Sequence, residues 1–126
     1  MCIRDRGSCA VGASRACLTW YFAEGCTRPG FDEYICIQNP SEETAHVLVT
    51  YMLENGETPT QEVEVAPFSR TTVKANDRVG VGHDVSCRIT SDVPVIAERP
   101  MYSTYYGSNP FWLGAADVLL GYTFER

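Results

Sequence analysis

The nearest approach to a catalytic pair in this sequence is His83 and Cys87, four residues apart. A cysteine nucleophile acts as a thiolate, which a neighbouring base or positive charge must stabilise. Cys87, however, shares one face of an alternating run with Val85 and Ile89, and that apolar face is expected to be buried. We therefore interpret the pair as a loop histidine beside a buried cysteine. The sequence contains no G-x-S-x-G, H-E-x-x-H or P-loop motif, so we predict no catalytic and no cofactor-binding residues.

Candidate metal ligands gather in only one loop of the sequence, residues 76–84. Asn76, Asp77 and Asp84 could there bind a hard cation such as calcium. Only two of the three are carboxylates and no EF-hand pattern is present, so a plain polar turn is the favoured interpretation. No two cysteines have the C-x-x-C spacing that is typical of a zinc site. We predict no metal site.

The cysteines raise the question of a disulfide. Of the six in the chain, Cys36 and Cys87 both lie in apolar runs, 51 residues apart, and they are the candidate pair. Bridging that span would stabilise the fold by about 4 kcal/mol in the chain-entropy model. Two packed free thiols are the equally weighted alternative.

The two ends of the sequence differ in character from its middle. Residues 1–6 resemble the translation of a sequencing-library adapter, and we exclude them from the fold as an artefact. On this interpretation the chain is a fragment of a longer reading frame. Residues 7–17 are small and aperiodic, which is typical of a linker. A single folded module is expected over residues 18–122, and residues 123–126 are interpreted as a tail or the start of the next linker.

The net charge restricts the classes of partner. Sixteen acidic and ten basic side chains give a formal charge of −6. A nucleic-acid-binding protein needs a basic surface to displace counterions from phosphates, so we predict no nucleic-acid partner. No apolar run approaches the roughly 20 residues that span a bilayer, so we predict no membrane insertion by this segment.

The elements that would position any site are short strands between turns. The segments 46–53 and 61–65 alternate apolar and polar residues on either side of Asn55-Gly56, a strong hairpin signal. The same alternation recurs at 85–90 and 93–99, which a turn is expected to separate. Seven to nine such strands without helical periodicity predict an all-β fold, specifically an antiparallel, immunoglobulin-like β-sandwich.

Strand alternation places one charged residue toward the core. Arg99 shares a face with Val95 and Ala97, and an unpaired buried charge is costly. Glu24, at the end of the first strand pattern, is the candidate partner. We predict a partly buried structural salt bridge between Glu24 and Arg99.

An aromatic segment near the C-terminus could form a surface for binding. Exposed aromatic rings can stack on sugars or mark a protein interface. By strand alternation about half of the segment should instead pack in the core. The candidate residues for a ligand-binding or inter-module surface are Tyr102, Tyr105, Tyr106, Phe111 and Trp112.

Three motifs carry a family resemblance: WYFAEG at 20–25, GFDEYICIQNP at 30–40 and SDVPVIAERPMY at 91–102. Together they resemble an uncharacterised family of extracellular bacterial β-sandwich repeats, which occur in tandem on secreted or cell-surface proteins. The resemblance implies an extracellular or cell-surface location and neighbouring repeats of the same polypeptide as partners.

These observations leave three functions to weigh. The favoured hypothesis is a non-catalytic structural or adhesive repeat, with an acidic surface that keeps it soluble. The alternative is a carbohydrate- or peptidoglycan-binding module attached to a cell-wall hydrolase, with cell-wall polysaccharide as its partner. A small thiol enzyme acting through Cys87 is the least favoured.

Overall fold

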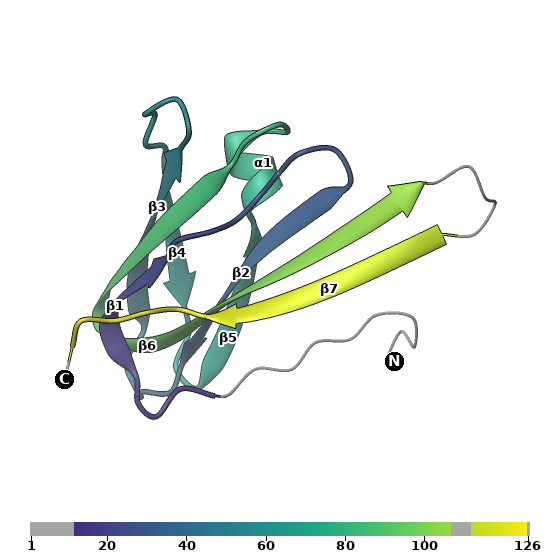
Figure 1. Ribbon diagram of the computed structural model, residues 1–126. Coiled ribbons are helices and arrows are strands. Elements are labelled where there is room, and N and C mark those ends of the chain that lie inside the picture. Colours follow the sequence, from purple (N-terminus) through teal and green to yellow (C-terminus); the bar gives the residue numbers. More distant parts are fainter. Residues whose placement is uncertain (1–11, 107–111, 126) are drawn as a thin grey trace.

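The computed structural model describes residues 12–106 and 112–125, except for the side chains of residues 105, 106 and 112–115. Within these residues the chain forms seven β-strands and one short helix (Figure 1). Their bounds are β1 (Cys17–Phe22), β2 (Phe31–Asn39), β3 (Ala45–Leu53), β4 (Thr60–Val65), β5 (Ser69–Lys74), α1 (Ala75–Val79), β6 (Val85–Tyr106) and β7 (Trp112–Leu120).

The long strand β6 organises the sheet. It spans 22 residues and pairs antiparallel with four other strands: β1 and β3 along its first half, β2 and β7 along its second. The order along the main path is β4-β3-β6-β2-β5. Pro94 lies in β6 between Ser91, the last partner of β3, and Ile96, the first partner of β2, so its missing N–H falls where the neighbouring strand changes. One strand therefore belongs to both halves of the fold.

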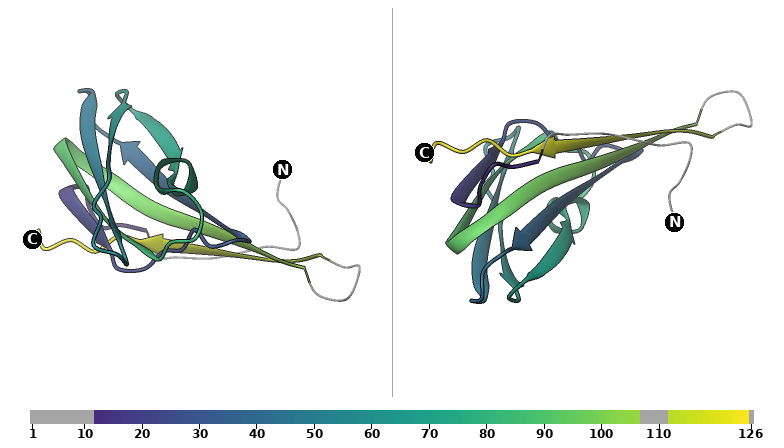
Figure 2. Two further views of the ribbon diagram at one scale, coloured as in Figure 1. Left: turned by 90° about the horizontal axis from the view of Figure 1, so that it is seen from above. Right: turned by 90° about the horizontal axis from the view of Figure 1, so that it is seen from below.

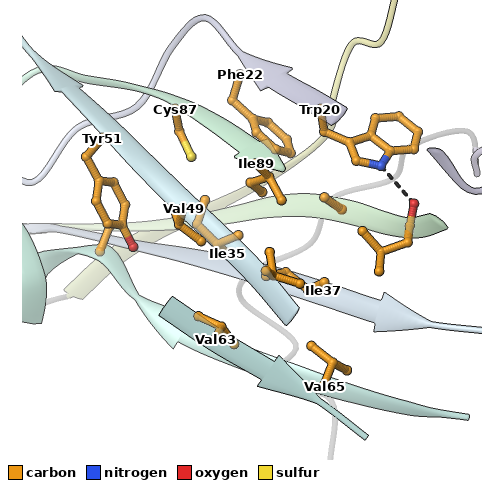
Figure 3. Close-up of a cluster of buried hydrophobic side chains, with 14 of the residues drawn as sticks. Trp20, Phe22, Ile35, Ile37, Val49, Tyr51, Val63, Val65, Cys87 and Ile89 are labelled. Atoms are coloured by element: carbon orange, nitrogen blue, oxygen red, sulfur yellow. Dashed lines mark hydrogen bonds between the residues drawn. The ribbon is translucent and has the colours of Figure 1, made fainter. Parts of the chain in front are cut away.

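Because β6 curves, the two halves of the sheet face each other and enclose the core. Figure 3 shows the side chains of β1, β2, β3, β4 and β6 converging between these halves. The indole N–H of Trp20 donates a hydrogen bond to the carbonyl of Val95 at 2.8 Å, which joins β1 to β6 across the core. The labelled members of the cluster, all buried, are Trp20, Phe22, Ile35, Ile37, Val49, Tyr51, Val63, Val65, Cys87 and Ile89.

The predicted hairpin is present between β3 and β4. Its tip is held by the N–H of Gly56, which donates to the carbonyl of Leu53 at 3.0 Å, and by the N–H of Glu57, which donates to Oδ1 of Asn55 at 2.9 Å. Gly56 has a φ of 88°, a conformation that glycine adopts without strain. The connection covers residues 54–59, so it is longer than a two-residue turn.

At the other end of the fold, β6 and β7 continue together past β2 as a two-stranded ribbon (Figure 2). On this side the pairing of β2 with β6 ends at Phe31, opposite Ser103, whereas the pairing of β6 with β7 reaches Tyr106. The ribbon therefore projects from the body of the molecule.

The chain enters and leaves the fold at the same place. The backbones of Tyr21 and Tyr122 exchange hydrogen bonds of 2.7 and 2.8 Å. The N–H of Thr19 donates to Oε2 of Glu125 at 2.8 Å, and the guanidinium of Arg15 donates to the carbonyl of Glu125. Parts of the predicted linker and tail thus pack on the module, while residues 1–6 and 7–11 lie outside the described residues.

The prediction of an antiparallel all-β fold is confirmed, with seven strands in the described part of the chain. The immunoglobulin-like sandwich is not confirmed, because β6 runs through both halves and makes one curled sheet of them. The helix α1 was not predicted. It lies at the start of the loop predicted from residue 76, and its first residue, Ala75, is buried beside β2.

Candidate functional site

The most unusual side chain in the core is Arg99, which is only 2% exposed. It projects from the inner face of β6, as strand alternation predicts. Its Nη1 donates to the backbone carbonyl of Glu24 at 2.6 Å, and its Nη2 donates to the carboxylate of Asp117 at 3.4 Å. Nη1 also lies 3.9 Å from Oε1 of Glu33. One guanidinium therefore ties β6 to β2, to β7 and to the segment that follows β1.

The predicted salt bridge between Glu24 and Arg99 is wrong in its acidic partner. Glu24 is exposed and contributes its backbone carbonyl, while the nearby carboxylates belong to Glu33 and Asp117. Glu33 could have been found from the sequence. It alternates with Ile35 and Ile37 on β2, which places it on the inner face beside the core.

Glu33 is itself 1% exposed and is incompletely paired. Its Oε2 and the Nε of Arg99 are buried without a hydrogen-bond partner within the described part of the chain. Burial raises the pKa of Glu33 from 4.5 to about 7, and the positive charge of Arg99 only partly opposes this. The carboxyl group therefore changes protonation near neutral pH inside a closed interior.

The backbone around Glu33 is held by two further residues. Asn76 of α1 accepts from the N–H of Glu33 at 2.9 Å and donates to the carbonyl of Phe31 at 2.8 Å. Gly25 lies against the carboxyl group, and a Cβ at this position would come within 1.6 Å of Oε1 of Glu33 and 2.8 Å of the carbonyl oxygen of Val85. The last residue of the WYFAEG motif is therefore a glycine for lack of space above the buried carboxyl.

An open groove of about 560 Å³ lies on the outer side of Gly25. Two of the three acidic residues in its lining have side-chain partners: Asp84 forms an ion pair with Arg28 at 2.7 Å, and a carboxylate oxygen of Glu54 lies 3.1 Å from Nδ1 of His83. Hydrogen bonds from the backbone and from the ring of His83 hold the pKa of Glu54 below its ordinary value. These contacts connect the loop before β6 to the segment after β1 and to the loop after β3, at the edge of the groove.

The loop considered for calcium is not assembled as a metal site. Asn76 is used to hold β2, and Asp84 is paired with Arg28. Over residues 12–106 and 112–125, no three His, Cys, Asp or Glu side chains are arranged to hold a metal ion. In the same part of the chain no helix has the length and apolar character needed to cross a membrane.

The predicted disulfide between Cys36 and Cys87 is not formed, and both thiols are free. Cys36 lies on the outer face of β2, where its Sγ is 3.3 Å from Oγ1 of Thr72. Cys87 faces the core from β6, opposite Phe22 and Tyr51, and is 2% exposed. The two residues point to opposite sides of the sheet. Burial raises the pKa of the Cys87 thiol, which makes the thiolate inaccessible near neutral pH.

The outer face of β2, β5 and β6 carries a pair of tyrosines. The rings of Tyr34 and Tyr102 meet edge to face, with centroids 5.8 Å apart and planes at 78°. Nζ of Lys74 lies 5.8 Å from the centroid of Tyr34 and 3.2 Å from Oδ1 of Asp32. A shallow groove of about 370 Å³ follows these rings. Its lining consists of Tyr34, Cys36, Arg70, Thr72, Pro100 and Tyr102.

Of the five residues predicted to form an aromatic surface, Tyr102 has a described side chain, which is 37% exposed. The side chains of Tyr105, Tyr106, Phe111 and Trp112 lie outside the described residues. Tyr34 was not among the predicted residues. It lies in the run 33–38, which is apolar almost throughout, as is typical of a strand that is covered on both faces. Tyr34 and Ile35 are consecutive in the strand, so their side chains point to opposite faces. Because Ile35 faces the core, the ring of Tyr34 must lie on the outer face.

Comparison with known proteins bears on the fold. No protein-family model and no curated protein sequence matches the chain. The crystal structure of Thermotoga maritima 1070 is similar, with a TM-score of 0.70 and 24% identity over 85% of this chain and 94% of that chain. The Anabaena sensory rhodopsin transducer is similar with a TM-score of 0.58 and 27% identity, over 70% of this chain and 97% of that chain. At 24% identity, the similarity to the Thermotoga maritima structure is evidence of the fold alone.

Proposed function

We propose that this chain is a non-catalytic structural or adhesive module of a secreted or cell-surface bacterial protein. The observation that supports this most is the placement of Glu33 and Arg99. Both are almost fully buried, and their contacts join β2, β6, β7 and the end of β1 rather than facing a cavity. A buried ion pair of this kind holds strands in position, whereas an acid or base in catalysis must reach a substrate.

In this proposal the two halves of the curled sheet act as the layers of an immunoglobulin-like sandwich, and neighbouring repeats of the same polypeptide are the partners. Both ends of the described fold lie together, at the bridge between Tyr21 and Tyr122. Successive modules would therefore be joined at one end of each module, so they would lie beside each other rather than in line. The formal charge of −6 favours solubility of such an array.

The proposal is tested by incubating the purified chain with isolated bacterial cell walls and with peptide and polysaccharide substrates. A structural module releases no product. Turnover that disappears in Glu33→Gln or Cys87→Ala, while the variant unfolds at the wild-type temperature, would overturn the proposal.

A carbohydrate- or peptidoglycan-binding module attached to a cell-wall hydrolase is the second candidate. The tyrosine face favours it, because an exposed aromatic ring beside polar side chains is a common sugar-binding arrangement. Tyr34 and Tyr102 are not coplanar, so a single sugar ring would stack on Tyr102 rather than on both. Retention of the chain on an insoluble polysaccharide, lost in Tyr102→Ala, distinguishes this candidate from a purely structural role.

A further inference from the structure

The groove along Tyr34 and Tyr102 has a chemical composition that restricts its ligand. Its volume of about 370 Å³ is at the lower end of the range typical of small-molecule sites, roughly 300–1,000 Å³. Both tyrosines stand on β2 and β6, which are inner strands of the sheet with neighbours on each side. The ring positions are therefore fixed by the sheet and not by a loop.

Among the residues that the structure describes, Arg70 is the only charged one that lines this groove. It is exposed on β5, opposite Gln38 of β2. The other cation nearby, Lys74, is already paired with Asp32 at 3.2 Å. The remaining polar atoms of the lining belong to hydroxyl and thiol groups, and no carboxylate or amide side chain is among them. The groove thus offers a strong positively charged donor and no negatively charged acceptor.

We propose that this groove binds a carboxylate-bearing sugar residue of an acidic polysaccharide. Tyr102 lies opposite Asp32 and Arg70 lies opposite Gln38, six residues further along β2, so the two side chains stand at opposite ends of the groove. One sugar ring stacks on the exposed face of Tyr102, and the carboxylate of a neighbouring sugar residue of the same chain receives hydrogen bonds from the guanidinium of Arg70. Arginine binds carboxylates through two parallel N–H groups, which fixes orientation as well as charge. A neutral sugar would leave Arg70 without a charged partner. The inference rests on the second candidate function and adds the class of sugar to it.

The overall negative charge of the protein does not prevent this binding. Two acidic side chains share the outer face of these strands: Asp32, which is paired with Lys74 at 3.2 Å, and Glu98, which lies opposite Cys36 and does not line the groove. Those on distant strands are largely screened from the groove, because the Debye length at physiological ionic strength is about 8 Å. The local pair of Arg70 and the ligand carboxylate is closer than this length and is screened much less.

The test compares trigalacturonic acid with its fully methyl-esterified form, which has the same rings without the charge. Affinities are measured by titration calorimetry at physiological ionic strength for the wild type, Arg70→Gln and Tyr102→Ala. Arg88→Gln removes the same charge from an exposed position in the first half of β6, and Tyr122→Ala removes another exposed tyrosine. These two variants are the matched controls. Poly-glutamate serves as a carboxylate polymer without sugar rings.

We expect the acid to bind the wild type at least about ten-fold more tightly than the ester, as the loss of one charged hydrogen-bonded contact predicts. Arg70→Gln should abolish this difference, Tyr102→Ala should weaken both ligands, and both controls should bind as the wild type does. Equal binding of acid and ester that is lost in Tyr102→Ala would overturn the inference and leave the carbohydrate-binding function standing. Binding of neither sugar would overturn both. Binding of poly-glutamate as tight as that of the acid, or binding unchanged in Arg70→Gln, would also overturn the inference.

Discussion

Replacing Glu33 by glutamine tests the buried cluster, because glutamine keeps the shape of the protonated carboxyl group and cannot ionise. The carboxyl of Glu33 is 1% exposed, and burial raises its pKa from 4.5 to about 7. The folded protein therefore binds this proton more tightly than the unfolded chain does. Folding takes up a proton between these two pKa values, so the free energy of unfolding falls as the pH rises through this window and is constant above it.

The size of the effect follows from the shift. A rise from 4.5 to about 7 corresponds to about 3 kcal/mol of stability that the wild type has below the window and lacks above it. In Glu33→Gln this contribution does not titrate. The stability of the variant relative to the wild type should therefore increase by about 3 kcal/mol between about pH 4 and about pH 8.

The assay is urea unfolding followed by tryptophan fluorescence at a series of pH values from about 4 to about 8. Glu62→Gln, at an exposed position on β4, is the matched control and should follow the wild type at every pH. A difference between Glu33→Gln and the wild type that stays constant with pH would refute the reasoning. So would a relative loss of stability in the variant at high pH, because it would mean that Arg99 stabilises the ionised carboxylate more than burial disfavours it.

Three further predictions concern packing. Gly25→Ala should destabilise the fold by about 3 kcal/mol in chemical unfolding, since its Cβ would overlap the buried carboxyl, whereas Gly12→Ala, with open space around it, should be neutral. A thiol reagent applied to the native protein should modify Cys36 and not Cys87, as mass spectrometry of peptides can show; early modification of Cys87 would contradict its burial. Trp20→Phe should cost about 2 kcal/mol through the lost hydrogen bond to β6 and the smaller ring, and an unchanged unfolding midpoint would argue against that bond.

Alternation of side chains predicted most of the strands and the inward direction of Arg99. It did not predict that β6 is continuous, because Ser91-Asp92 has the composition of a turn. In the structure this pair stays extended within β6, and the carboxylate of Asp92 accepts from the N–H of His46 at 2.8 Å, at the start of β3. A tertiary contact thus uses the polar side chain that local sequence would assign to a turn.

The partners within the candidate sites were harder to predict than the strands. Glu33 adjoins a turn in sequence, where a solvated carboxylate is expected, although its alternation with Ile35 on β2 places it inside. Cys36 lies in an apolar run, and such a run does not show which of its residues face the core and which face outward. The sequence therefore could not exclude a disulfide between Cys36 and Cys87. Which strands become neighbours depends on the path of β6, and single-strand patterns do not contain that information.

The most direct test of the account is the effect of Arg99→Met on stability and on binding in parallel. The measurement is made at about pH 8, above the pKa of about 7 to which burial raises Glu33, so that both partners are charged. Removing one partner of a buried ion pair costs about 3–5 kcal/mol, and Arg99 lies on the face of β6 opposite to Tyr102. We predict a loss of stability of this size in urea unfolding, with the affinity of the remaining folded protein for trigalacturonic acid equal to that of the wild type. Unchanged stability together with altered binding or a lost catalytic activity would contradict the claim that Arg99 serves the fold.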